Sequence, residues 1–271
     1  MAAAHLAVAG CLLLTAAARH GQGAESAPAL DPTVGSISGM VRFEGKAPEG
    51  ERFDLAPAEK ALCGLFKRAL PFEVGKGGAL RGAVVFLAEP VPAVEAAVLP
   101  EGVPLTMRTC EWLPHVLDAT VGQALVLVNQ DAAPLQAELR WRGADAAADP
   151  ARRPRTLYAP GKGQQVAVVL RAPGIIDVDC AGCRSWSQAE VQVFDHRFHD
   201  TTDERGAFAI HHVPPGNYTL LARGRTLGEA SVSVTVVAGR ESVVNLVLPA
   251  RPPASAPAPA AAAEPAAPAA P

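Results

Sequence analysis

The chain has 271 residues, of which 49% are apolar and 19% charged, and its formal net charge is −3. That length suits one large domain or two small ones. Because the balance is slightly acidic and no basic cluster stands out, the sequence excludes the electrostatic surface that nucleic-acid binding requires.

Residues 1–24 are typical of a secretory signal. An apolar stretch that begins at His5 is followed by small residues, and it is too short to span a bilayer. The same stretch contains the string VAGC, ending at Cys11, which resembles a bacterial lipobox, so a lipid anchor on Cys11 is an alternative. We expect an exported protein, periplasmic or extracellular, without a transmembrane segment in the mature chain.

Four cysteines follow the expected signal: Cys63, Cys110, Cys180 and Cys183. An even number of cysteines in an exported protein suggests disulfide bonds. We expect Cys63 to pair with Cys110, although four cysteines allow three connectivities and the spacing does not choose among them.

Short strands between turns account for most of the remaining sequence. Alternating or apolar β-branched runs predict strands at 36–43, 82–88, 107–110, 114–120, 124–128, 135–141, 164–170, 175–179, 191–194, 207–213, 217–223, 231–237 and 242–248. Residues 51–64 suggest one helical turn at most, and no longer amphipathic helix is evident. Strands of this length and spacing favour an all-β sandwich architecture.

The chain ends in a different composition. Residues 249–271 are almost only alanine and proline. Such a segment buries too little apolar surface to order itself, so we expect a disordered tail.

Four segments resemble the carboxypeptidase regulatory-like (transthyretin-like) β-sandwich. They are GSISGMV at 35–41, GAVVFL at 82–87, TDERGAFAI at 202–210 and VPPGNYTL at 213–220. Because these segments lie early and late in the chain, the resemblance implies a discontinuous domain formed by residues 35–90 with 195–248.

The residues between these segments resemble a cupredoxin, in particular the exported plastocyanin-like proteins of the methylamine-utilisation type. The matching strings are CEWLPHV at 110–116, VGQ at 121–123, NQD at 129–131 and residues 180–194. The resemblance implies a Greek-key sandwich over 91–194, joined to the regulatory-like sandwich.

The resemblance also implies that the copper ligands of the family are lost. A cupredoxin site requires two histidines, one cysteine and usually a weak axial methionine. Leu135 and Glu138 stand at the places of the early histidine. In the late loop Cys180 is kept, Cys183 replaces a histidine and Ser187 replaces the methionine.

The pair Cys180 and Cys183 leaves three readings open. The two residues form a structural disulfide that closes a short loop, hold copper or zinc through their thiolates, or act as a redox dithiol. A redox dithiol requires a lowered thiol pKa, usually from a helix N-terminus, and no helix is predicted after Cys183.

Other chemistry-bearing residues have simple structural explanations. Trp112, Trp141 and Trp186 form either a sugar-binding platform or part of the core. His211 and His212 are adjacent in a strand, so we expect them to face opposite sides and not to share a site. No catalytic triad, paired carboxylates or phosphate-binding glycine loop is readable.

The sequence therefore predicts a non-enzymatic, exported binding or structural protein without a cofactor. Its expected partner is a protein or a glycan of the cell envelope. The first alternative is a copper-binding or electron-transfer protein that uses Cys180 and Cys183. The second alternative is a thiol–disulfide redox protein.

Overall fold

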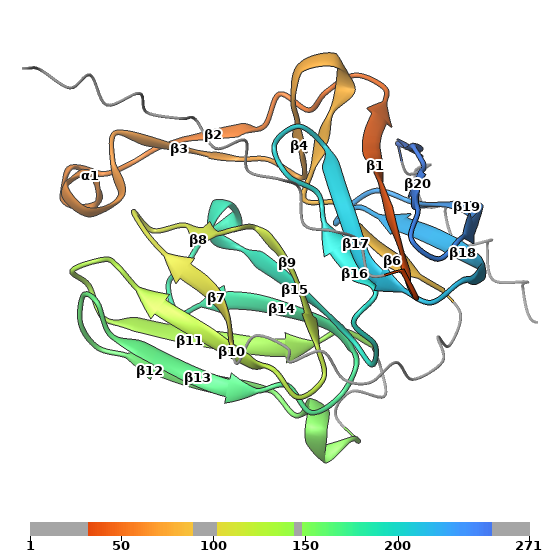
Figure 1. The fold of residues 1–271 in the computed structure, drawn as a ribbon. Helices are drawn as coiled ribbons and strands as arrows, with labels where there is room; N and C mark the ends of the chain where they lie inside the picture. Colours follow the sequence, from red (N-terminus) through yellow and green to blue (C-terminus); the bar gives the residue numbers. More distant parts are fainter. Residues whose placement is uncertain (1–31, 89–101, 144–147, 251–271) are drawn as a thin grey trace, which may run out of the picture.

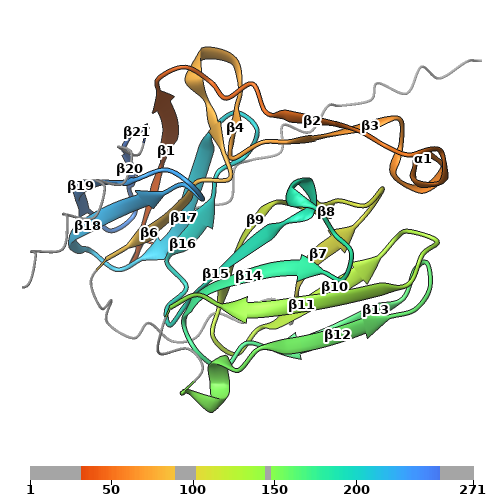
Figure 2. The ribbon, with the colours of Figure 1, turned by 180° about the vertical axis from the view of Figure 1, so that it is seen from behind.

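The computed structural model describes residues 32–88, 102–143 and 148–250. The expected signal, Cys11, the boundary between residues 90 and 91, and residues 251–271 of the expected tail lie outside these ranges. The described residues form two β-sandwiches side by side, which confirms the all-β class (Figures 1 and 2). No helix in the described ranges combines the length and the apolar character needed to cross a bilayer.

The first sandwich, called here the regulatory-like sandwich, is built from the two ends of the described chain. One sheet places β1 between β17 on one side and β20 and β21 on the other, and the second sheet has the order β16-β6-β18-β19. Their bounds are β1 Gly35–Glu44, β6 Val84–Leu87, β16 His199–Thr201, β17 Ala207–Val213, β18 Gly216–Arg223, β19 Glu229–Val236, β20 Glu241–Val243 and β21 Leu246–Pro249. The two-residue pair β4 (Glu73–Val74) and β5 (Leu80–Arg81) precedes β6, with the short 3-10 turn η1 (Lys76–Gly78) between them.

The second sandwich, called here the cupredoxin-like sandwich, has a mixed sheet on each side. The sheet orders are β13-β10-β7-β8 and β12-β11-β14-β15-β9. Their bounds are β7 Gly102–Met107, β8 Trp112–Leu113, β9 Val116–Thr120, β10 Ala124–Asn129, β11 Leu135–Trp141, β12 Arg155–Ala159, β13 Gln165–Val169, β14 Gly174–Cys180 and β15 Ala189–Phe194. Alternate residues of β11 are buried between the sheets, as its period-2 pattern predicts. The 3-10 turn η3 (Pro150–Arg152) precedes β12.

An arm, residues 51–69, projects from the regulatory-like sandwich over one end of the cupredoxin-like sandwich (Figure 1). It consists of β2 (Glu51–Asp54), the helix α1 (Pro57–Cys63) and β3 (Phe66–Ala69), and β2 pairs only with β3. Pro57 opens the helix, the Glu59 side chain accepts a hydrogen bond from the Ala56 N–H, and Gly64 ends the helix with φ of 90°. The sequence predicts a helical turn in this region, but not the hairpin that carries it.

Two predicted strands were wrong in detail. The strand predicted at 107–110 ends at Met107, and Thr109 and Cys110 form a turn with positive φ. The observed strand begins at Gly102 and includes Pro104. A proline is tolerated at this position because β8 pairs with Thr106 and Met107 and does not extend as far as Pro104. The strand predicted at 242–248 is two strands, and Asn245 between them accepts a hydrogen bond from the Met40 N–H.

The prediction that His211 and His212 face opposite sides was also wrong. The register of β1 and β17 shifts at this point, His212 adopts φ of 57°, and both side chains are exposed. A bulge of this kind breaks the alternation of a strand. The described residues nevertheless contain no group of three histidine, cysteine or acidic side chains placed to hold a metal ion.

The two sandwiches contact each other through a small apolar cluster and a polar network. Phe86 of β6 lies 4.9 Å from Phe194 of β15, measured between ring centroids. Nearby, His199 Nδ1 lies 2.6 Å from Asp118 Oδ2, and the Thr201 hydroxyl donates to the same carboxylate. Strand β16 is thereby joined to β9 of the other sandwich.

The electrostatics of this contact predict a pH-dependent stability. Burial would by itself raise the pKa of Asp118, but the hydrogen bond and charge of His199 and the hydrogen bond of Thr201 outweigh burial and hold the pKa below its ordinary value. Burial raises the pKa of the neighbouring Asp200. A carboxyl group whose pKa is lowered on folding stabilises the protein at pH values above its ordinary pKa. This stabilisation is lost as the pH falls through the pKa of the folded state.

We expect Asp118→Asn to lower the free energy of unfolding at neutral pH. The difference from wild type is expected to shrink as the pH falls below the ordinary carboxyl pKa of about 4 and through the lower folded-state pKa. Urea unfolding at several pH values measures this difference. Asp195→Asn, at an exposed position between β15 and β16, serves as the control. A difference that stays constant down to the lowest pH contradicts the proposed role of the carboxylate.

Candidate functional site

A cavity of about 160 Å³ lies at the end of the cupredoxin-like sandwich that the arm covers. It is bounded by α1, by the turn after β7, by the loop between β10 and β11, and by the loop between β14 and β15. Its lining consists of Glu59, Leu62, Cys63, Met107, Cys110, Asn129, Asp131, Ala133, Pro134, Leu135, Cys180, Ala181, Gly182, Cys183, Arg184, Trp186 and Ser187.

The structure brings together most of the positions that the sequence places at a former copper site. Leu135, Cys180, Cys183 and Ser187 all line this cavity. Glu138 does not, because it lies on the other face of β11 and forms an ion pair with Arg140 at 2.7 Å.

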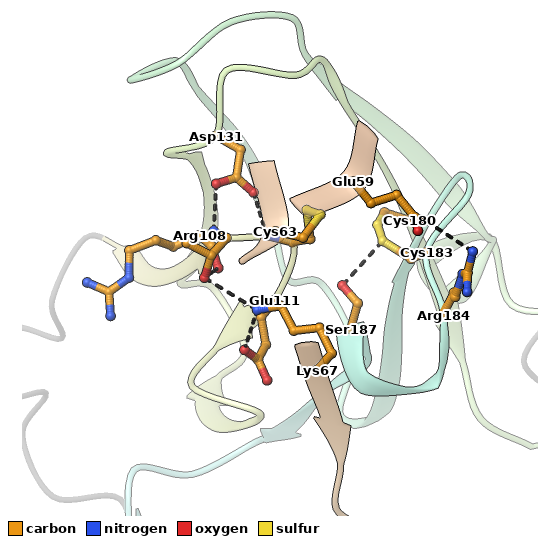
Figure 3. Close-up of a disulfide and its surroundings, with 12 residues drawn as sticks. Glu59, Cys63, Lys67, Arg108, Glu111, Asp131, Cys180, Cys183, Arg184 and Ser187 are labelled. Carbon is orange, nitrogen blue, oxygen red and sulfur yellow. Dashed lines mark hydrogen bonds and ion pairs between the residues drawn. A yellow bond between two sulfur atoms is a disulfide. The ribbon is translucent and has the colours of Figure 1, made fainter. Parts of the chain in front are cut away.

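These residues do not fit a cupredoxin copper ion. Leu135 offers hydrocarbon, and the sulfurs of Cys180 and Cys183 are joined to each other as a disulfide, with Cα atoms 5.1 Å apart. The Ser187 hydroxyl donates to Cys183 Sγ at 3.3 Å, and a hydroxyl is a poor ligand for a soft metal. Figure 3 shows the bridge with Ser187 beside it. These four residues therefore do not supply the two imidazoles and the thiolate of a trigonal copper site.

Asp131 organises the turn on the other side of the cavity. Its carboxylate accepts hydrogen bonds from the N–H groups of Thr109 at 2.6 Å and of Cys110 at 2.7 Å (Figure 3). Both donors have positive φ, at 51° and 63°, which is unusual for residues with a side chain. Two charge-assisted hydrogen bonds to one buried carboxylate stabilise this turn and so position the Cys110 sulfur.

Asn129 holds the loop that follows it. Its side-chain N–H groups donate to the carbonyls of Ala133 at 2.9 Å and Ala159 at 3.0 Å, and its side-chain oxygen accepts from the Asp131 N–H. Asn129 and Asp131 served in the sequence only as landmarks of the resemblance. In the structure they position the loop and the turn that line the cavity.

The arm is fixed over the cavity by a disulfide between Cys63, the last residue of α1, and Cys110, with Cα atoms 5.1 Å apart. At the rim, the Arg184 guanidinium donates to Glu59 at 3.0 Å, and Phe53 of β2 packs on Trp186 with ring centroids 4.8 Å apart. The arm is therefore attached to the cupredoxin-like sandwich at several points.

A buried lysine joins the base of the arm to the turn. Lys67 Nζ lies 3.0 Å from Glu111 Oε2, and Glu111 also lies 3.5 Å from His115 Nε2. Burial would by itself raise the pKa of Glu111, but the hydrogen bonds of His115 and Lys67 and the charge of Lys67 outweigh burial and lower the pKa. The sequence pattern does not indicate the link to the arm, because Lys67 and Glu111 are 44 positions apart in the chain.

The three tryptophans are buried side chains. Trp112, Trp141 and Trp186 are at most 7% exposed. The alternative that they form a sugar-binding platform is therefore wrong. Trp112 and Trp141 belong to the core between the sheets, and Trp186 packs beneath the arm.

Comparison with known proteins identifies one part of the chain by sequence. Residues 182–249 match the family described as carboxypeptidase regulatory-like domain. The sequence predicts that this domain resumes at residue 195, but the match begins at residue 182. The match therefore includes β15 of the cupredoxin-like sandwich. No curated protein matches the sequence.

The solved structures that match this chain include, among others, two kinds of copper protein. A copper(I) form of a mutant amicyanin is 16% identical and covers 41% of this chain and 98% of its own, with a TM-score of 0.28. A copper-containing nitrite reductase from Thermus scotoductus SA-01 is 20% identical and covers 40% of this chain and 26% of its own, also with a TM-score of 0.28. Similarity at this level transfers no function to the chain.

The resemblance to the carboxypeptidase regulatory-like family is confirmed for residues 182–249, which match the family model, and the strands β7 to β15 form a second β-sandwich.

Proposed function

We propose that this chain is an exported, non-enzymatic binding or structural protein of the cell envelope, whose cupredoxin-like sandwich has lost its copper ligands. One observation carries the proposal. Leu135, the bridged pair Cys180–Cys183 and Ser187 together line the cavity at the former copper site. A hydrocarbon, two oxidised sulfurs and a hydroxyl offer no set of soft donors to a metal ion.

Two further features support a binding or structural role. Two disulfides suit an oxidising compartment, as the signal-like N-terminus does. The arm also covers the cavity, and the Cys63–Cys110 disulfide attaches it covalently to the cupredoxin-like sandwich. That end of the sandwich therefore presents a surface formed by the arm and the sandwich together. We expect a protein or a glycan of the envelope as the partner.

Copper addition to the air-oxidised mature protein tests the proposal. We expect no visible absorption band from sulfur-to-copper charge transfer. We also expect the same spectrum from the double variant Cys180→Ser, Cys183→Ser, since the bridged sulfurs do not bind the metal. A band that wild type shows and the double variant lacks overturns the proposal.

The second candidate is a copper-binding protein that works in the reduced state. It is favoured by Met107, whose thioether side chain is buried and lines the same cavity as Cys180 and Cys183. Reduction of the bridge would offer two thiolates next to a thioether, a donor set that suits copper(I). The thiol–disulfide redox alternative lacks such support, because only the three-residue 3-10 turn η4 (Ser185–Ser187) follows Cys183.

A further inference from the structure

The cavity beneath the arm has the lining of a binding site for an apolar molecule. Leu62 of α1, Met107 of β7, Pro134 and Leu135 contribute hydrocarbon and a thioether, and the two disulfides contribute bridged sulfurs. Neither a disulfide nor a thioether is a strong hydrogen-bonding group. Most of the surface that faces the cavity therefore gains little from contact with water.

The polar side chains of the lining make their hydrogen bonds within the protein. Asp131 accepts from two backbone N–H groups, Asn129 bonds two carbonyls, and Ser187 donates to Cys183. At the rim, Arg184 is paired with Glu59. Each of these groups therefore has a hydrogen-bond partner within the protein.

The size of the cavity sets the size of the ligand. Its volume is about 160 Å³. A cavity of about 150 Å³ lined by leucine, isoleucine and phenylalanine, engineered in another protein, stays dry and binds benzene or xenon. The cavity described here is partly open to solvent, because Pro134, Ala181 and Arg184 of its lining are exposed, so the comparison concerns size alone: a molecule of about the size of benzene fits.

We propose that this cavity is a binding site for a small, uncharged apolar molecule of about the size of benzene. The inference rests on the proposed function in one respect, because the bridge between Cys180 and Cys183 keeps the cavity free of a metal ion. It gives the binding role a ligand class: neutral, apolar and without strong hydrogen-bonding groups.

Benzene titration of the oxidised mature protein tests the site, with the methionine methyl groups labelled for NMR. The Met107 methyl signal is expected to shift with benzene and to saturate. The Met40 methyl group on β1 serves as an internal control, since it lies in the other sandwich and its signal is expected to stay in place. A Met107 signal that does not move up to the solubility limit of benzene overturns the proposal.

Variants locate the binding. Ala133→Phe places a ring in the cavity lining and is expected to abolish the shift of Met107, whereas Val169→Phe, at an exposed position on β13, is expected to leave it unchanged. Tryptophan fluorescence, which reports on Trp112 and Trp141 in the core of the cupredoxin-like sandwich, shows whether each variant is folded. Leu62→Phe replaces Ala133→Phe if that variant does not fold. An equal response in wild type and in the filled variant places benzene elsewhere and overturns the proposal.

The benzene experiment can fail while the proposed function still holds. A count of free thiols tests the loss of the metal site without benzene. A fully bridged protein that fails to bind benzene overturns this inference alone.

Discussion

Replacing both Cys63 and Cys110 with serine is expected to lower the free energy of unfolding by about 4 kcal/mol, because the bond closes a loop with a sequence separation of 47. In the loop-entropy account, a long closed loop restricts the unfolded chain strongly. The loss is measured by urea unfolding, followed through tryptophan fluorescence. Because the arm packs on Trp186, its detachment also changes the emission of the folded protein.

The second disulfide provides a matched control for this prediction. Cys180 and Cys183 are separated by only 3 positions, so replacing both with serine is expected to cost about 2 kcal/mol. Limited proteolysis within residues 51–69 should increase in the first double variant and not in the second. An equal loss of stability in the two double variants, or no change in proteolysis of the arm, contradicts the role assigned to the Cys63–Cys110 bond.

Replacing Asp131 with asparagine is expected to lower the free energy of unfolding by about 3 kcal/mol. The carboxylate is buried and accepts hydrogen bonds from the N–H groups of Thr109 and Cys110. Asparagine has one acceptor oxygen, so its amide group faces an N–H donor and one of the two partly buried donors loses its partner. Urea unfolding measures the effect.

A control for this substitution is Asp54→Asn, since Asp54 is exposed and pairs only with the exposed Arg52 in the described structure. We expect a change of less than about 0.5 kcal/mol there. If Asp131→Asn is as mild as Asp54→Asn, the positive-φ turn at Thr109 and Cys110 does not depend on the carboxylate, and the description of the cavity wall is wrong.

The strands could be predicted wherever their burial alternates or is continuous. Residues 135–141 and 207–213 have the predicted bounds, because apolar side chains at every second position must face a core. Prediction failed where pairing partners decide the local geometry. Pro104 is compatible with β7 only because its neighbour β8 is short, and the bulge at His211 and His212 arises from the register with β1.

The candidate site could be predicted in part. The resemblance singled out Leu135, Cys180, Cys183 and Ser187, and these residues do meet in one cavity. The arm that covers them was missed, because residues 51–69 carry no periodic apolar pattern and pair with neither sandwich sheet. Its position depends on contacts across long sequence separations, such as Lys67 with Glu111, which a local pattern does not encode.

The central claim is that the former copper site is closed by oxidation and by the loss of its ligands. A count of free thiols in the mature exported protein tests it most directly: alkylation without reduction, followed by intact mass measurement, with and without copper(I). The account predicts no free thiol among Cys63, Cys110, Cys180 and Cys183. Two free thiols that map to Cys180 and Cys183, and that copper(I) protects from alkylation, would contradict it.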